Sequence, residues 1–151
     1  MLSASLNTPL GPLCVTEENG AITALDWHDA FMPDDTPLLR RALEQLSAYF
    51  AGELTQFDLP VRIRGTDFQR QVCDAIAAIP HGETRSYGDL ARTLKVPAQA
   101  IGTGCGGNPI PIIIPCHRVL GTSGLGGFSG KGGVETKVWL LRHEGAGGLL
   151  I

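Results

Sequence analysis

The segment "NPIPIIIPCHRV", residues 108–119, restricts the fold more than any other stretch of the chain. Three prolines punctuate its first eight residues, and because proline lacks a backbone N–H, a long helix is excluded there. The isoleucines predict an extended, buried segment. It runs directly into Cys116, His117 and Arg118, which place a thiol, an imidazole and a guanidinium side by side. The segment is either a buried strand that ends at a turn or a rigid support for a nucleophile.

The overall composition is that of an ordinary globular protein. The 151 residues suit one domain or two small ones, and 43% of them are hydrophobic and 18% charged. The first ten residues lack the pattern of a signal peptide, and no apolar run approaches the roughly 20 residues of a membrane span. We therefore expect a cytoplasmic protein without membrane contact. The four cysteines form no CxxC pair, so we expect free thiols.

The net charge of −3 is unevenly distributed along the chain. Residues 1–65 hold four basic and nine acidic side chains, a net charge of −5, whereas residues 66–151 hold eight basic and six acidic ones, a net charge of +2. An anionic partner is therefore expected to meet the second part of the chain.

Residues 1–65 are predicted to form a small α/β domain with a short β-sheet and one helix. Two strand-like runs flank Asn19-Gly20, which is typical of a hairpin turn. Residues 37–50 have helical spacing, with Asp35 or Thr36 as the cap. The run "FDLPVRI", residues 57–63, is a candidate for a further strand.

Residues 66–151 are predicted to form a mainly α-helical domain. A helix capped by Thr66 precedes two short helices, residues 85–94 and 96–107, joined by a tight turn. That pattern is typical of a helix-turn-helix, and a plain helical corner is the alternative. A loop with six glycines, residues 122–133, precedes a final helix for which Val134, Val138, Trp139 and Leu141 are the candidate core residues.

Cys116 is the candidate nucleophile. A thiol reacts as its thiolate, and an imidazole such as that of His117 can take the proton. A carboxylate that fixes the tautomer of the imidazole assists, and Glu144 is the candidate. No second Cys/His pair has the spacing of a metal site. We expect Cys105 to pack as a small residue in the glycine-rich helix. The alternative is that it lines the wall of a pocket that contains Cys116.

These motifs together resemble the O6-alkylguanine-DNA alkyltransferase family. The resemblance rests on "PCHRV" preceded by "GGNPIPIII", on "KVWLLRHEG", and on the upstream "TDFQRQVCDAIAAIPHGETRSYGDLA", and it covers residues 66–146. It implies direct DNA repair, in which an alkyl group moves irreversibly from O6 of guanine, and less readily from O4 of thymine, to Cys116. Each molecule would act once, as a monomer and without a cofactor. The family sometimes binds structural zinc in its N-terminal domain, but that domain offers only Cys14 and His28 here, so we expect no zinc.

The resemblance also implies roles for individual residues. His117 would deprotonate Cys116 through a water, Glu144 would orient His117, and Asn108 would tie the DNA-binding helices to the active segment. Double-stranded DNA would bind through its minor groove, with the alkylated base flipped out of the stack. Tyr87 and the backbone of Val119 and Ser129 would contact that base. The expected DNA-binding residues are Ser86, Arg92, Lys95, Ala98 and Gln99.

One position departs from the family pattern. The family usually has an arginine early in the recognition helix, where this chain has Gln99, and the turn before that helix is shorter here. Glutamine can fill the gap left by a flipped base but lacks the stacking cation of arginine. We therefore expect weaker DNA binding or less efficient flipping than an arginine would give.

Two other functions remain open from the residues alone. A non-catalytic protein that binds alkylated bases and flags them for repair would use the same DNA-binding helices, but relatives of that kind lack the cysteine. A thiol-based redox or metal sensor is the other alternative, and the chain has no resolving cysteine close to Cys116 in sequence.

Overall fold

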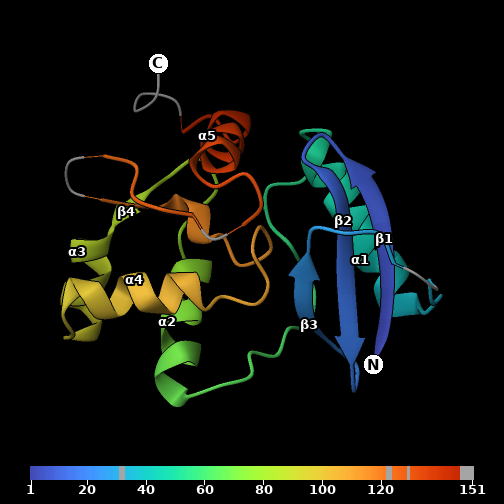
Figure 1. The fold of residues 1–151 in the computed structure, drawn as a ribbon, viewed down its shortest axis with the longest axis horizontal. Helices are drawn as coiled ribbons and strands as arrows, with labels where there is room; N and C mark the ends of the chain where they lie inside the picture. Colours follow the sequence, from blue (N-terminus) through green and yellow to red (C-terminus); the bar gives the residue numbers. More distant parts are fainter. Residues whose placement is uncertain (31–32, 122–123, 129, 147–151) are drawn as a thin grey trace. The chain divides into compact units, whose positions relative to one another are not determined.

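The computed structural model describes residues 1–30, 33–121, 124–128 and 130–146. The chain forms two compact units, Met1–Arg62 and Ile63–Ile151 (Figure 1). Within the described residues, no helix is both long enough and apolar enough to cross a membrane.

The first unit is a three-stranded antiparallel sheet with one helix packed against it (Figure 1). Strands β1 (Leu2–Thr8), β2 (Gly11–Glu18) and β3 (Ala21–Asp26) lie in sequence order. Asn19 and Gly20 form the predicted turn between β2 and β3, with φ angles of 51° and 78°. Strand β1 was not predicted, although Leu2, Ala4 and Leu6 alternate with polar residues as in a half-buried strand.

Helix α1 (Pro37–Phe50) begins where the sequence predicts. The Thr36 hydroxyl accepts a hydrogen bond from the Leu39 N–H at 3.0 Å, so Thr36 rather than Asp35 is the cap. The prediction of a further strand at residues 57–63 is wrong. Only an isolated bridge forms there, in which Ile22 pairs with Val61.

The second unit is mainly helical. Its elements are α2 (Asp67–Ala77), β4 (Arg85–Ser86), α3 (Tyr87–Leu94), α4 (Ala98–Gly106), the 3₁₀ turn η1 (Cys116–Arg118), β5 (Val119–Leu120) and α5 (Val134–His143). Helices α3 and α4 are joined by three residues, the first of which, Lys95, has a φ of 59°. Strands β4 and β5 form a short parallel pair that the sequence analysis missed.

Helix α4 packs closely against α2. A Cβ atom added to Gly104 would lie 2.8 Å from a methyl carbon of Val72, so the contact requires glycine. The Gln69 side chain reinforces it by donating a hydrogen bond to the Gly104 carbonyl at 2.8 Å. The position of α4 is therefore set by backbone-to-side-chain contact with α2.

The isoleucine segment before Cys116 is buried, as predicted, but it is not extended. Ile112 has a φ of 74°, and the Ile114 N–H donates to the Ile110 carbonyl at 2.9 Å. An extended strand would direct alternate side chains to opposite faces. The turn instead allows all four isoleucines of the segment to be buried.

Helix α5 buries only part of the face that the sequence predicts. Leu140 and Leu141 are buried together with Thr136 and Lys137, whereas Val134 is 44% exposed. Val138 and Trp139 are half-buried. The prediction is confirmed for Leu141 and wrong for Val134, and it did not include Lys137.

Candidate active site

Cys116 lies at the start of the η1 turn, 6% exposed. The turn is closed by a hydrogen bond from the Arg118 N–H to the Pro115 carbonyl at 2.9 Å. In an extended segment, successive side chains would point to opposite faces. Because the backbone turns at this point, that restriction does not apply to Cys116. Its support is the buried isoleucine turn that precedes it.

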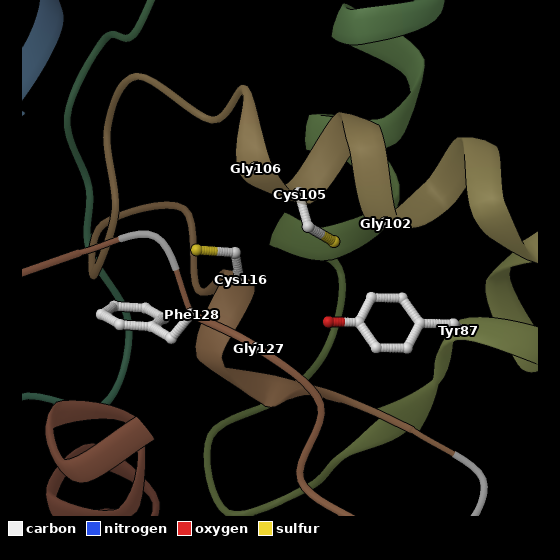
Figure 2. A pocket seen from close by; sticks show the side chains of 7 residues that line it. All are labelled: Tyr87, Gly102, Cys105, Gly106, Cys116, Gly127 and Phe128. Carbon is white, nitrogen blue, oxygen red and sulfur yellow. The ribbon is translucent and has the colours of Figure 1, made fainter. Parts of the chain in front are cut away.

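Cys116 lines a cavity of about 390 Å³. The other lining residues come from the start of α3, from α4 and from the glycine-rich loop: Tyr87, Gly102, Cys105, Gly106, Gly127 and Phe128. Figure 2 shows the Tyr87 hydroxyl directed into this space. Cys105 is thus buried and also lies in the pocket wall, the alternative that the sequence analysis disfavoured. The cavity therefore lies between the Cys116 thiol and helices α3 and α4.

The buried carboxylate of Glu144 contacts the turn that carries Cys116. Glu144 Oε2 is 2.7 Å from His117 Nε2, and both side chains are fully buried. Arg118 donates to the same carboxylate through Nε at 2.8 Å and Nη2 at 3.0 Å. Its Nη1 donates to the Ile79 carbonyl at 2.6 Å. The cluster therefore joins η1 to α5 and to the segment after α2.

The surroundings of His117 determine which nitrogen can act as a base. A carboxylate only accepts hydrogen bonds, so the ring nitrogen that faces Glu144 carries the proton. Nδ1 is then the acceptor, and it is buried without a hydrogen-bond partner among the described residues. Burial lowers the pKa of His117, although the hydrogen bond with Glu144 opposes this shift. A neutral imidazole with a free Nδ1 lone pair can accept a proton.

Asn108 holds the cysteine support through both ends of its amide. Nδ2 donates to the Ile114 carbonyl at 2.8 Å, and Oδ1 accepts from the Ile110 N–H at 3.0 Å. Burial raises the pKa of Cys116, whereas a hydrogen bond from Asn108 and the positive charge of Lys137 lower it. Asn108 and Lys137 thus oppose the effect of burial on the thiol.

Lys137 is the residue that sequence analysis missed at this site. It is fully buried, and its ammonium donates to the Val119 carbonyl at 2.7 Å and to the Gly127 carbonyl at 3.0 Å. It also lies 5.9 Å from the centre of the Tyr87 ring. A lysine in an amphipathic helix is normally exposed. Its place in "KVWLLRHEG" was the only available signal.

The residues expected to contact DNA lie at both ends of α3 and at the start of α4. Ser86 caps α3, accepting from the Asp89 N–H at 2.9 Å. Ala98 and Gln99 line a second cavity of about 360 Å³, which shares Tyr87 and Gly102 with the first. Arg92 pairs with Asp89, and neither Arg92 nor Lys95 lines either cavity. Ser129 lies outside the described residues.

Metal ligands are not grouped in the part of the chain that the structure describes: no cluster of three or more His, Cys, Asp or Glu side chains occurs there. The cysteines of the two units are free thiols.

Two family models match the chain. The model of the 6-O-methylguanine DNA methyltransferase DNA-binding domain matches residues 67–146, and that of the ribonuclease-like domain of the same methyltransferase matches residues 1–63. The chain belongs to the O6-methylguanine-DNA methyltransferase family. The resemblance noted in the sequence is thereby confirmed, as is the fold class of a small α/β domain followed by a mainly helical one.

Relatives of this methyltransferase match over nearly the full length. A methylated-DNA–protein-cysteine methyltransferase of Mycobacterium tuberculosis is 43% identical over 150 residues, covering 93% of this chain and 90% of its own. The constitutive enzyme of Bacillus subtilis is 41% identical, with 91% of each chain covered. The crystal structure of Mycobacterium tuberculosis OGT in complex with DNA is 42% identical and superposes with a TM-score of 0.86, covering 97% of this chain and 94% of that one.

The buried carboxylate yields a stability prediction. Glu144→Gln should lower the free energy of unfolding by about 3–5 kcal/mol, because Arg118 would be left as a buried charge without its partner. Urea denaturation measures this loss. Glu135→Gln, at the exposed start of the same helix, should change the value by less than about 1 kcal/mol. Equal effects of the two substitutions would contradict a buried ionic cluster.

Proposed function

We propose that Cys116 is the acceptor through which this methyltransferase repairs O6-alkylguanine in DNA. The observation that carries the proposal is the position of the Cys116 thiol in the cavity between α3, α4 and the glycine-rich loop, with the buried His117–Glu144 pair behind it. The family's reaction moves the alkyl group to a cysteine of the protein itself. The proposal extends to O4-alkylthymine as a poorer substrate.

The reaction follows from the chemistry of these side chains. His117 Nδ1 accepts the Cys116 proton through a bridging water, while Glu144 holds the ring in position. The thiolate attacks the alkyl carbon, a sulfur–carbon bond forms, and the bond from that carbon to O6 breaks. The electron pair goes to O6, and the guanine takes up one proton in place of the alkyl group. The thioether is stable, so each molecule acts once, and no cofactor enters the balance.

The protein binds DNA, and we propose that residues 66–151 carry both the DNA contacts and the acceptor, with residues 1–65 as a separate domain. A base within a duplex cannot reach a thiol that is 6% exposed, so the alkylated base must be flipped out of the stack. Tyr87 and the backbone of Val119 and Ser129 would contact it. The starts of α3 and α4, with Ser86, Ala98 and Gln99, would lie in the minor groove of double-stranded DNA. Arg92 and Lys95 would contact phosphates. The protein would act as a monomer in the cytoplasm.

Mass spectrometry tests the acceptor directly. After incubation with an oligonucleotide duplex that contains O6-methylguanine, the peptide with Cys116 should gain the mass of one methylene, and the duplex should regain guanine. Cys116→Ala should abolish the transfer and retain DNA binding. An unmodified wild-type protein that remains bound to the lesion would instead indicate a non-catalytic lesion binder.

The pH dependence of the transfer rate tests the base. Protonated His117 cannot accept the Cys116 proton, and burial holds its pKa below the ordinary 6.5. The rate should therefore stay high as the pH falls to 6.5 and decline only below it. In His117→Gln the thiol must ionise unaided, so the rate should keep rising with pH above about 8.5, because burial raises the pKa of Cys116. An unchanged profile in this variant would exclude His117 as the base.

The glutamine at position 99 yields a prediction for DNA affinity. Gln99→Arg should tighten binding to duplex DNA and steepen the dependence of log K on log salt by about 1, because one more phosphate would be neutralised. Salt titrations by fluorescence anisotropy measure both quantities. Gln99→Met, of similar length but uncharged, is the control. If the arginine and methionine variants bind alike, Gln99 does not limit DNA binding.

A further inference from the structure

The hydrogen bonds at the end of α4 involve a side chain from another helix. The Asn108 N–H, which in a continuing α-helix would donate to the Gly104 carbonyl, donates instead to the Cys105 carbonyl at 3.2 Å. The last carbonyls of a helix need partners from outside it, and Gly104 is buried. Gln69 supplies the donor, with its Nε2 2.8 Å from the Gly104 oxygen. Gln69 of α2 therefore caps the end of α4.

The Gln69 amide has a defined place where α2 and α4 pack together (Figure 1). Its Nε2 also donates to Cys73 Sγ, one turn further along α2, at 3.4 Å. A Cβ atom at Gly107 would lie 2.8 Å from Gln69 Oε1, so the absence of a side chain at position 107 leaves room for the amide. The Thr66 hydroxyl holds the backbone N–H of Gln69 at 3.1 Å. Neighbours on both helices thus fix this side chain.

Gln69 holds the part of α4 that lies next to the acceptor thiol. Its amide lies against positions 104 and 107, and the two residues between them, Cys105 and Gly106, line the cavity with Cys116 (Figure 2). Asn108 follows directly, and its amide holds the isoleucine turn that precedes Cys116. Loss of the Gln69 contact would therefore release the junction between α4 and the support of the thiol.

The DNA contacts proposed above lie at the other end of the same helix. Ala98 and Gln99 are the first two residues of α4, whereas Gly104 lies in its last turn. A change at Gln69 should therefore act on the end of α4 beside the thiol and leave the DNA-binding end in place. Displacing a reacting group by about 1 Å can cost on the order of 100-fold in rate, so a small shift at this junction is enough to slow the transfer.

We propose that Gln69 is a positioning residue for alkyl transfer. By capping α4 at Gly104, it keeps the end of this helix aligned with the Asn108 support of Cys116 while the flipped base is delivered to the thiol. The inference rests on the proposed function. Gln69 touches neither the base nor the reacting atoms, and it takes no part in proton transfer. It acts on the rate of the chemical step and not on the affinity for DNA.

Single-turnover transfer from a duplex that contains O6-methylguanine tests this role. Rates measured over a range of protein concentrations, with protein in excess of DNA, separate the limiting rate from the dissociation constant. Gln69→Met, of similar length but without a donor, should lower the limiting rate by roughly 10-fold or more and change the dissociation constant by less than about 3-fold. Gln71→Met is the matched control. Gln71 is exposed on the same helix, so both quantities should stay at their wild-type values.

Two further variants distinguish positioning from a general loss of structure. Gln69→Lys retains an N–H donor for the Gly104 carbonyl and should recover most of the limiting rate. Gly107→Ala should slow the transfer by displacing the Gln69 amide, and it tests the same contact if the methionine variant does not fold. In the Gln69→Ala background, where that amide is absent, Gly107→Ala should add little.

The pH profile of the limiting rate gives an independent readout. His117 still accepts the Cys116 proton in Gln69→Met, so this variant should keep the shape of the wild-type profile at a lower rate. A profile that changes as in His117→Gln would mean that Gln69 acts on proton transfer, and the positioning role would be wrong.

The outcomes separate this inference from the proposed function. If the wild type transfers no methyl group to Cys116, the proposed function fails, and the inference fails with it. If the wild type transfers methyl but Gln69→Met keeps the limiting rate, or loses only DNA affinity, the role of Gln69 alone is overturned. The same holds if Gln69→Lys is as slow as Gln69→Met, or if the effects of Gln69→Ala and Gly107→Ala on the rate are independent.

Discussion

The second unit depends on the interactions of the buried Glu144 carboxylate. A carboxylate removed from water is costly unless charges and hydrogen bonds replace its hydration. Here Arg118 supplies two donors and His117 a third, and both come from the turn that carries the cysteine. Arg118 also binds the Ile79 carbonyl, beyond the end of α2. The hydrogen bonds that compensate the buried charge of Glu144 therefore hold α5, η1 and the segment after α2 together. The Cys116 thiol is carried by η1.

Helix α4 meets two opposite demands with the same residue type. It must approach α2 closely, which requires glycine at position 104, and it must leave open the cavity beside Cys116, which glycines at positions 102 and 106 achieve. Glycine weakens the helix in every case. Part of that loss is offset by tertiary contacts, among them the hydrogen bond from Gln69 to the Gly104 carbonyl. The helix is thus held by its neighbours more than by its own sequence.

Sequence reasoning succeeded where a short-range interaction decides the structure. The caps Thr36 and Thr66 and the turn at Asn19-Gly20 act within three or four residues, and each lies where the sequence predicts. It failed where distant segments decide. The positive φ of Ile112 depends on burial of the whole isoleucine turn, and the burial of Lys137 depends on carbonyls 10 and 18 residues away. No local pattern reports either.

The two cavity thiols illustrate how the proposed reaction would distinguish one cysteine from another in the same pocket. Burial raises the pKa of both, so burial alone cannot select a nucleophile. Cys116 accepts a hydrogen bond from Asn108, which favours loss of its proton. In the proposed reaction, His117 accepts that proton. The largest influence on Cys105 is burial, which its weaker attraction to Lys137 does not offset. In the proposed reaction, selectivity between the two thiols therefore arises from a proton acceptor and a hydrogen-bond donor placed beside one of them, both held by the buried turn that precedes Cys116 and the carboxylate behind it.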